Sequence, residues 1–302
     1  GADYTPRAVP PLAVFPSATM TSSKIELSVR NHDRDLAGMT YVYPVLSRRA
    51  GGVSVGVNLN PNNACNWHCV YCQVPDLVRG AAPLIDLARL EVELDGFLDA
   101  LVNGDWLLRN APEGAREVRD IALSGNGEPT SAAAFPEVVE LIHRLRQKYG
   151  LTGVPLRLIT NGSLLGRERV RAGIARMGEI GGEVWFKVDG GRPEDIERIN
   201  GVRMPVARVV RNLAACAQLC PTWVQTCVFR WDGVGPDAQA LAAYLDVLER
   251  AGSDRLRGVL LYGVARPSMQ PEAPRVSPVS LDELECVAEA IRKKGLTVTV
   301  SP

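Results

Sequence analysis

The stretch VSVGVNLNPNNACNWHCVYC, residues 53–72, joins a short apolar run to a loop that holds three of the seven cysteines in the chain. The run Val53–Leu59 is rich in valine and nearly continuous in apolar character, which is typical of a strand covered on both faces of a parallel sheet. Cys65, Cys69 and Cys72 follow it with the spacing C-x3-C-x2-C. The stretch therefore predicts a buried strand whose carboxyl end leads into a metal-binding loop.

Three thiolates on one short loop can hold more than one kind of metal centre. In a four-iron four-sulfur (4Fe-4S) cluster they leave one iron without a protein ligand, which is what a reacting cofactor needs. The alternative is a structural zinc ion with His68 as the fourth ligand. Zinc sites favour paired C-x2-C halves, and the adjacent His68 and Cys69 are awkward to aim at one ion. We therefore favour a 4Fe-4S cluster bound by Cys65, Cys69 and Cys72.

The same alternation of short apolar runs and amphipathic segments continues along the rest of the chain. Apolar residues recur at helical spacing between the runs, and Ser280 with Glu283 forms the capping-box pair that starts the last helix. A succession of β–α units predicts a parallel sheet with right-handed crossovers, either an open doubly wound sheet or a barrel. Further strands are expected at Val118–Leu123, Leu156–Thr160, Glu183–Val188, Trp223–Phe229, Arg257–Leu261 and Leu296–Val300.

Composition and charge narrow the broad class of the protein. Hydrophobic residues make up 46% of the 302 residues and charged residues 23%, as in an ordinary globular protein. Lys+Arg and Asp+Glu both number 34, so no overall basic field argues for nucleic acid. No apolar run approaches the length that spans a bilayer, the first residues lack the features of a secretion signal, and the odd number of cysteines does not suit a disulfide framework. We expect a cytoplasmic protein with an N-terminal arm and cap over residues 1–52 and a core over residues 53–302.

Polar motifs follow the predicted strands at the points where the strands end. Because the carboxyl ends of parallel strands meet at one edge, the motifs are expected to converge around the cysteines. Glycine allows close backbone approach or a positive φ, and a buried lysine or glutamine needs a ligand or a polar partner. The motif residues are Gly125, Asn126, Gly127 and Glu128 after the second strand, Asn161 and Ser163 after the third, Lys187 and Asp189 at the fourth, Gln225 in the fifth and Tyr262 after the sixth.

Each motif also has an ordinary structural interpretation. The glycines of the second motif can form a plain turn, and Ser163 can be a helix N-cap. Lys187 or Asp189 can belong to a satisfied ion pair, and Tyr262 can pack in the core. These interpretations stay open beside the ligand-binding ones.

The motifs together resemble those of the radical S-adenosylmethionine (SAM) superfamily. Its C-x3-C-x-aromatic-C pattern is present with Tyr71 as the aromatic residue, and the likeness covers about residues 53–290. The usual Gly-Gly-Glu string of the family is replaced by Gly-Asn-Gly-Glu-Pro, which starts at Gly125. That string, Thr-Asn-Gly-Ser-Leu-Leu and Tyr-x-Val-Ala-Arg-Pro are similar to the branch of iron–sulfur oxidoreductases related to wybutosine-synthesis enzymes, which modify a guanosine in tRNA.

The resemblance implies a partial (β/α)6 TIM-like barrel with an N-terminal extension, and it implies an enzyme. An electron donor such as flavodoxin or ferredoxin would reduce the 4Fe-4S cluster, whose open iron chelates the amino and carboxylate groups of SAM. Reductive cleavage of SAM would give a 5′-deoxyadenosyl radical that abstracts hydrogen from a substrate, for which a nucleoside, tRNA or a small metabolite is a candidate. The residues expected to contact SAM are Tyr71, Gly125, Asn126, Gly127, Glu128, Asn161, Ser163, Lys187, Asp189, Gln225 and Tyr262.

Other interpretations remain for the site and for the remaining cysteines. A non-catalytic iron–sulfur protein for electron transfer or sensing would not need Glu128 or the polar residues around it. Cys216, Cys220 and Cys227 would hold a second cluster or simply pack as small apolar residues, and Cys286 is expected to pack in the last helix.

Two further features concern the surface of the predicted barrel. Arginines concentrate at residues 48–49, 167–176 and 203–211, where they would contact RNA or form a solvated face. The irregular, proline-containing segments Asp33–Gly52 and Pro267–Pro278 lie outside the β–α pattern, and we expect both to shape the substrate pocket.

Overall fold

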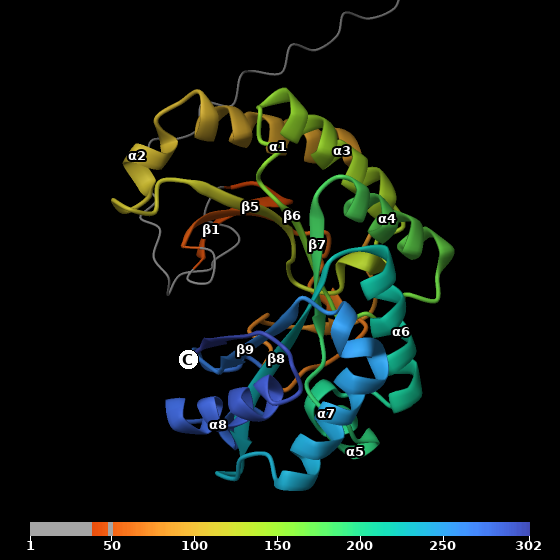
Figure 1. Cartoon of the computed structure of the whole chain (residues 1–302). Helices are drawn as coiled ribbons and strands as arrows, with labels where there is room; N and C mark the ends of the chain where they lie inside the picture. The colour runs from red at the N-terminus through yellow and green to blue at the C-terminus, as the bar shows by residue number, and fades with distance from the viewer. Residues whose placement is uncertain (1–37, 48–50) are drawn as a thin grey trace, which may run out of the picture.

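The computed structural model describes residues 38–47 and 51–302, and its centre is a curved, mostly parallel sheet (Figure 1). The strand order is β1-β2-β5-β6-β7-β8-β9-β11, and β10 is added antiparallel to β8. Successive pairs from β2 to β11 are parallel, whereas β1 is antiparallel to β2. The bounds of these strands are β1 (Val42–Ser47), β2 (Gly52–Val57), β5 (Val118–Leu123), β6 (Leu156–Thr160), β7 (Gly182–Lys187), β8 (Thr222–Trp231), β9 (Gly258–Gly263), β10 (Val276–Pro278) and β11 (Val298–Ser301).

Helices cover the outer, convex face of this sheet (Figure 1). Helices α3, α4, α6 and α7 pack side by side in this order, and each has a buried apolar stripe. None of the helices in the described part of the chain is both long and apolar enough to cross a bilayer. The helices are α1 (Leu87–Val102), α2 (Trp106–Asn110), α3 (Phe135–Lys148), α4 (Glu168–Glu179), α5 (Pro193–Asn200), α6 (Val206–Leu219), α7 (Ala238–Gly252) and α8 (Leu281–Arg292), with short 3-10 turns η1 (Pro129–Ser131), η2 (Ser253–Arg255) and η3 (Ala273–Arg275).

The predicted strands and the predicted helix start are confirmed. Each predicted strand lies within two residues of an observed one at its start, because a buried parallel strand leaves an apolar run in the sequence. Helix α8 begins with the expected capping box: the backbone N–H of Ser280 donates to Glu283 at 2.8 Å, and the N–H of Glu283 donates to the Ser280 hydroxyl at 3.2 Å. Local sequence patterns therefore predicted most of the strands that form the core.

Strand β1 is one of the strands that were not predicted from the sequence, together with the short strands β3 (Ala64–Cys65), β4 (Val78–Arg79) and β10. It pairs with β2 in register from Val42–Val57 to Ser47–Gly52, so the sheet begins inside the segment predicted as an N-terminal arm and cap. Pro44 lacks a backbone N–H, which argues against a central strand but suits the edge position that β1 occupies among the described strands. The proposed boundary at residue 53 therefore divides a hydrogen-bonded strand pair.

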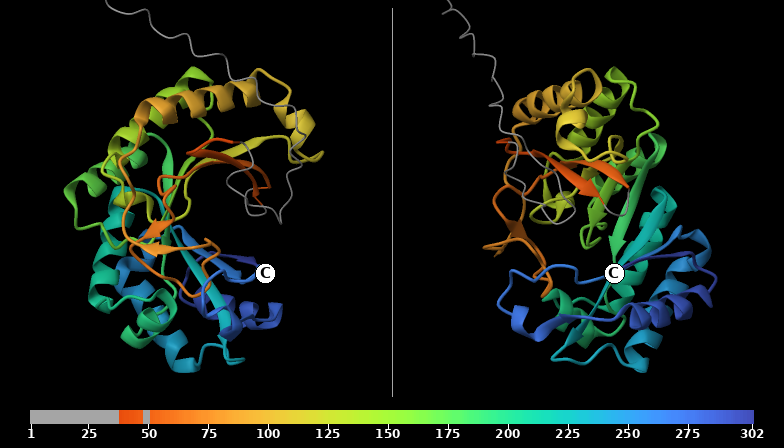
Figure 2. Two further views of the ribbon diagram at one scale, coloured as in Figure 1. Left: turned by 180° about the vertical axis from the view of Figure 1, so that it is seen from behind. Right: turned by 90° about the vertical axis from the view of Figure 1, so that its left-hand side faces the viewer.

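The described sheet curves into a partial barrel with an open side. In Figure 2 the sheet and its helices form a C-shaped wall, and the two ends of the strand order, β1 and β11, face the opening. The prediction of a partial (β/α)6 TIM-like barrel is thus confirmed. Alternate residues of its strands point into the hollow, and in this fold class the carboxyl ends of the strands carry the chemistry.

Candidate functional site

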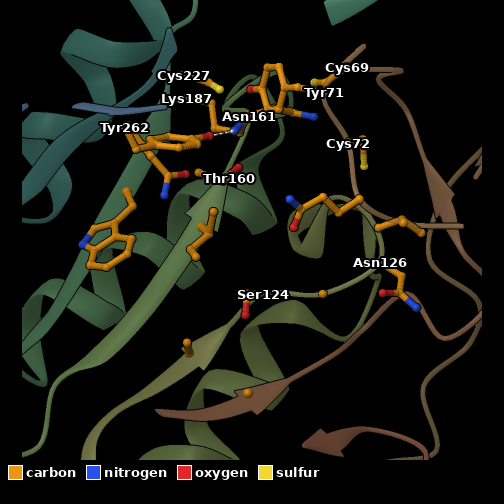
Figure 3. A pocket seen from close by; sticks show the side chains of 18 of the residues that line it. Cys69, Tyr71, Cys72, Ser124, Asn126, Thr160, Asn161, Lys187, Cys227 and Tyr262 are labelled. Atoms are coloured by element: carbon orange, nitrogen blue, oxygen red, sulfur yellow. Dashed lines mark hydrogen bonds between the residues drawn. The ribbon is translucent and has the colours of Figure 1, made fainter. Parts of the chain in front are cut away.

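The carboxyl ends of the strands surround a cavity of about 720 Å³ (Figure 3). This volume falls in the range of small-molecule and cofactor sites. Among the described residues, Ser163 and Asp189 do not line the cavity but form hydrogen bonds with Asn161 and Tyr71, which do. The predicted site residues that line it are Cys65, Cys69, Cys72, Tyr71, Gly125, Asn126, Gly127, Glu128, Asn161, Lys187, Gln225 and Tyr262.

The cysteine loop is closed by a small two-stranded sheet. Strand β3 (Ala64–Cys65) pairs in parallel with β4 (Val78–Arg79). Between them the backbone N–H groups of His68 and Val70 donate to the end of α5, at 3.0 and 2.9 Å. The loop is therefore fixed at both ends and in the middle, with its three thiols on the cavity wall.

The position of His68 argues against the zinc alternative. Its Nε2 atom lies 3.9 Å from a carboxylate oxygen of Glu272, and His68 is not among the cavity-lining residues. Within residues 38–47 and 51–302 no three His, Cys, Asp or Glu side chains converge on a single ion position. A four-iron cube is larger than one ion, and its thiolates stand around a volume rather than a point. Three thiols on one loop match the donor set of such a cube.

Two thiols of the loop, those of Cys65 and Cys69, are buried in a way that favours their protonated form. Burial raises the pKa of Cys65 and Cys69 to about 12. Two donors partly oppose this effect: the backbone N–H of Trp67 lies 3.5 Å from Cys65 Sγ, and Nδ2 of Asn200 lies 3.4 Å from Cys69 Sγ. A metal centre that binds these sulfurs as thiolates must therefore displace their protons.

A clamp from the segment after β9 holds the end of the cysteine loop. The carbonyl oxygen of Cys72 accepts hydrogen bonds from Met269 N (2.9 Å), Gln270 Nε2 (3.2 Å) and Ser268 Oγ (3.2 Å). Ser268 and Gln270 are 7% and 5% exposed, so the carbonyl group has little access to other donors. We call Ser268, Met269 and Gln270 the Cys72 clamp.

The clamp corrects one expectation about the substrate pocket. Pro267–Pro278 was expected to shape that pocket, but no described residue of this segment lines the cavity. The preceding residues Val264 and Arg266 do line it, and so do Tyr43 and Val45 from the segment Asp33–Gly52. The proline-containing segment instead supports the cysteine loop from outside.

Close backbone approach explains the two glycines of the second motif. A Cβ atom on Gly125 would lie 2.2 Å from Asn58 Oδ1, and one on Gly127 would lie 2.0 Å from the carbonyl oxygen of Ala64. Neither glycine has a positive φ. Asn126 between them donates from Nδ2 to Asn63 Oδ1 at 2.6 Å. The motif thus lies against the cysteine loop, and only glycine leaves the required space.

Glu128 is a buried carboxylate held by four donors. Its Oε1 accepts from Thr130 N (3.1 Å), Thr130 Oγ1 (2.6 Å) and Thr160 Oγ1 (2.6 Å), and Oε2 accepts from Asn161 N (2.7 Å). Burial raises the pKa of Glu128, although these hydrogen bonds oppose the shift. Oε2 accepts a single hydrogen bond from the described chain and retains capacity for a donor from a ligand in the cavity.

Asn161 and Ser163 hold the cysteine loop through Asn66. Asn161 Nδ2 donates to Asn66 Oδ1 at 2.9 Å, and Asn66 Nδ2 donates to Ser163 Oγ at 2.8 Å. The Ser163 hydroxyl also donates to Asn161 Oδ1 at 2.7 Å. Ser163 is not a helix N-cap, because α4 has its N-cap at Arg167. The third motif therefore positions the loop, and Asn161 alone of the pair faces the cavity.

Lys187 lies between two tyrosine rings at the cysteine end of the cavity (Figure 3). Its Nζ donates to Tyr262 Oη at 3.0 Å and lies 4.9 Å from the ring centroid of Tyr71. Burial raises the pKa of Tyr71 well above its usual value, and the charge of Asp189 adds to this shift. Lys187 thus brings a cation close to Cys69, whose pKa it lowers.

Asp189 is a structural centre rather than a free ligand. Its Oδ2 accepts from Tyr71 Oη (2.5 Å) and Asn200 Nδ2 (2.9 Å), and its Oδ1 accepts from the backbone N–H of Cys227 (3.0 Å). These bonds join the cysteine loop, α5 and β8. Both oxygens accept hydrogen bonds from protein groups, and Asp189 does not line the cavity that holds the cysteines.

The remaining cysteines do not form one site. Cys216 and Cys220 are neighbours at the end of α6, where Thr222 Oγ1 donates to Cys216 Sγ at 3.5 Å. Cys227 lines the cavity instead. Cys286 is exposed on α8 rather than packed, contrary to our expectation. The second-cluster interpretation therefore has no geometric support in the described residues.

Most of the arginines that could favour RNA form local ion pairs and hydrogen bonds. On α4, Arg169 pairs with Glu137 and Arg176 pairs with Glu140. Arg203 pairs with Glu197 at 2.6 Å. Arg48 and Arg49 lie outside the described residues. The pairing favours the solvated-face interpretation for α4.

Asn66, Asn200 and the clamp residues Ser268 and Gln270 were not identified from the sequence as supports of the cysteine loop. The asparagine-rich string around the cysteines was a signal for Asn66, because amide groups commonly support a loop. Asn200 and the clamp come from distant segments, and no local pattern distinguishes them. Only their hydrogen bonds to the cysteine loop in the folded structure reveal their role.

The fold and the site define a partial-barrel protein that presents three cysteines and a glycine-rich motif to one cavity. Residues 59–233 match the sequence model of the Radical SAM superfamily, and the chain belongs to that superfamily. UPF0026 protein slr1464 of Synechocystis sp. is 30% identical over 159 residues, which are 52% of this chain and 51% of that protein. The chain spans about half or less of the curated relatives that it matches.

Two solved structures have a similar fold. A radical SAM methyltransferase from Sphaerobacter thermophilus aligns with a TM-score of 0.57 at 16% identity, over 86% of this chain and 68% of that chain. SuiB from Streptococcus suis, solved with S-adenosylmethionine bound, aligns with a TM-score of 0.54 at 11% identity, over 84% of this chain and 52% of that chain. At these identities the likeness concerns the fold, which is the partial barrel described above.

Proposed function

We propose that the chain is an enzyme that binds a 4Fe-4S cluster through Cys65, Cys69 and Cys72 and cleaves SAM reductively. The observation that carries this proposal is the presence of all three thiols on the wall of one cavity, together with the glycine motif and the buried carboxylate of Glu128. Thiolates are the usual ligands of such clusters, and three of them leave one iron open. A purely electron-transferring protein would not need a cavity of this size beside its cluster.

The bound groups would supply the difficult chemistry: one electron enters the sulfonium of SAM, a carbon–sulfur bond breaks to give methionine and a 5′-deoxyadenosyl radical, and the radical takes a hydrogen atom from the substrate. The protein residues bind and orient. Glu128 has the charge to hold the ammonium of SAM, and Lys187 and Asn161 offer donors to its carboxylate and ribose. The ring of Tyr262, and the backbone beside Tyr71, offer surfaces for adenine.

The partners follow from the same chemistry. An external reductant such as flavodoxin or ferredoxin would supply the electron. A nucleoside, tRNA or a small metabolite stays the candidate substrate, and the relation to wybutosine-synthesis enzymes stays a prediction. The division into an arm over residues 1–52 and a core over residues 53–302, and a cytoplasmic location, also stay predictions.

The test uses the full chain, reconstituted with iron and sulfide without oxygen. Wild-type protein should be brown, hold iron and form 5′-deoxyadenosine from SAM after reduction with dithionite. Cys72→Ser should lose all three properties, and Cys286→Ser, which changes an exposed cysteine on α8, should keep them. A colourless wild-type protein would overturn the proposal. A brown protein that forms no 5′-deoxyadenosine would favour the electron-transfer alternative.

A further inference from the structure

A network of charged side chains occupies the part of the cavity nearer the amino ends of the strands. Asp120 of β5 accepts hydrogen bonds from the hydroxyl of Ser54 on β2 and from the guanidinium of Arg157 on β6. Arg157 Nε donates to Glu183 Oε1 on β7 at 2.6 Å. Trp185 Nε1 donates to the same oxygen at 3.1 Å, and its ring centroid lies 4.9 Å from the Arg157 guanidinium. The network spans four neighbouring strands.

This network holds more negative than positive charge. Two carboxylates, Asp120 and Glu183, share the single guanidinium of Arg157. The side chain of Asp120 is only 3% exposed and that of Arg157 18%, so water compensates the excess poorly. Burial raises the pKa of Asp120 even though Arg157 and Ser54 lower it. Two other cations lie on these strands: Arg119 pairs with Glu117 at 3.1 Å, and Lys187 donates to Tyr262 at the cysteine end.

The network faces the cavity instead of closing it. Ser54, Asp120, Arg157 and Trp185 all line the same cavity as the three cysteines. A network that served only to join strands would be expected to be neutral and enclosed, since an uncompensated buried charge lowers stability. The exposed side of the network is therefore suited to a ligand.

Gln225 provides a second, independent sign of a ligand. It is 4% exposed and lines the cavity from β8, where it lies in register with Lys187. Within residues 38–47 and 51–302 its carboxamide makes no hydrogen bond to another protein group. Buried amides are nearly always paired, so this one is expected to pair with a molecule that enters the cavity.

We propose that Asp120, Arg157 and Gln225, which line the cavity, form the substrate subsite, with the carboxylate of Glu183, which pairs with Arg157, adding negative charge, and that the subsite binds a nitrogen-bearing cation, an alkylguanidinium or alkylammonium group. This inference rests on the proposed function, because it names the substrate class of the same cavity. Such a group compensates the excess negative charge, and its N–H donors match the carboxylate oxygens and the Gln225 carbonyl. The cysteines and the glycine motif leave this part of the cavity to the substrate.

The test measures binding of small probes to the reconstituted full chain, with and without SAM, by calorimetry. n-Butylguanidinium and n-butylammonium are the cationic probes, n-butylurea is the neutral planar counterpart and pentanoate the anionic one. The cations should bind at least about tenfold more tightly than n-butylurea. Glu183→Gln should abolish this preference, and Gln225→Leu should weaken cation binding several-fold.

The control is Glu137→Gln, which removes an exposed carboxylate on α3 and should leave the preference unchanged. Equal binding of n-butylguanidinium and n-butylurea, or an unchanged preference in Glu183→Gln, would overturn the subsite. Asp120 is more deeply buried, so the test does not depend on its variants folding. Formation of 5′-deoxyadenosine without any probe reports separately on the proposed function, so the two proposals fail by different measurements.

Discussion

The side-chain amide of Gln270 donates a 3.2 Å hydrogen bond to the carbonyl oxygen of Cys72, a residue 198 positions earlier in the chain. The same amide donates to the carbonyl of Val74 at 2.8 Å. The last cysteine of the loop is thus held by the segment that follows β9. Because Val264 and Arg266 of that segment line the cavity, the position of Cys72 depends on the same piece of chain that meets the cavity contents.

We predict that Gln270→Leu loosens the cysteine loop while leaving the barrel folded. Leucine nearly preserves the volume, but it removes the side-chain donor of the Val74 carbonyl and one of the three donors of the Cys72 carbonyl. A buried carbonyl left without a donor costs about 1–3 kcal/mol. Iron should be lost to a chelator several-fold faster than from wild-type protein, as measured by absorbance. Gln239→Leu changes an exposed glutamine on α7 and is the control. Equal rates of iron loss in all three proteins would refute the role of the clamp.

Gly127→Ala should disrupt the contact between the glycine motif and the cysteine loop. The added Cβ would lie 2.0 Å from the carbonyl oxygen of Ala64, so one of the two backbones must move. Overpacking of this kind costs about 1–3 kcal/mol, which urea unfolding of the metal-free chain can measure. The matched change Gly153→Ala meets no atom within 4 Å and should be close to neutral. Unchanged stability of Gly127→Ala would show that the turn is more adaptable than its contacts indicate.

Glu128→Gln should weaken SAM binding without removing the cluster. The variant keeps the shape of the side chain, but it removes the charge that the ammonium of SAM requires and turns an amide toward the donors of Thr130 and Asn161. The dissociation constant should rise by about tenfold or more in equilibrium dialysis. Iron content should stay at the wild-type level, as it should in the surface control Glu137→Gln. Wild-type affinity in Glu128→Gln would remove this residue from the SAM site.

The start of α8 should contribute a pH-dependent part of the stability. The backbone N–H of Ser280, followed by Arg230, lowers the pKa of Glu283 to about 2, from an ordinary value of 4.5. A carboxyl group with a lowered pKa in the folded state stabilises the fold above its unfolded pKa and loses this effect as the pH falls toward the folded pKa. Glu283→Gln should therefore lower the midpoint of thermal unfolding at pH 7, and the difference from wild type should shrink below about pH 4.5.

Asp282→Asn is the control for this effect, because it removes an exposed charge from the same first turn of α8. It should change the unfolding midpoint less than Glu283→Gln at neutral pH. A difference between Glu283→Gln and wild type that stays constant down to pH 3 would show that the lowered pKa does not stabilise the helix start.

The sequence predicted those parts of the fold that leave a local pattern. Short, largely apolar runs predicted β2, β5 and β6 because parallel strands are buried on both faces, and the cysteine spacing predicted the loop. Glu128 and Lys187 were found because the polar residues that follow parallel strands meet at one edge. These predictions depend only on residues that are close together in the sequence and on the general geometry of parallel sheets.

The parts that could not be predicted depend on long-range contacts. The clamp residues Ser268 and Gln270 contact the cysteine loop from 198 and 196 residues further along the chain, and nothing near them in the sequence marks this role. Asp189 was expected to contact SAM, but its oxygens are engaged by Tyr71, Asn200 and the Cys227 backbone. Whether a buried acid meets a ligand or a protein donor is decided by distant partners.

The incomplete closure of the barrel has a consequence for access. Tyr43 and Val45 of β1 and Val300 and Ser301 of β11 line the cavity from the two free ends of the described sheet, where no ladder hydrogen bonds join the strands. Widening a seam of this kind breaks no strand pairing, unlike prising apart a closed barrel. An opening between two unpaired strands can widen to admit a bulky molecule. The volume of the cavity in the described structure therefore does not set the upper limit on the size of the molecule that enters from this side.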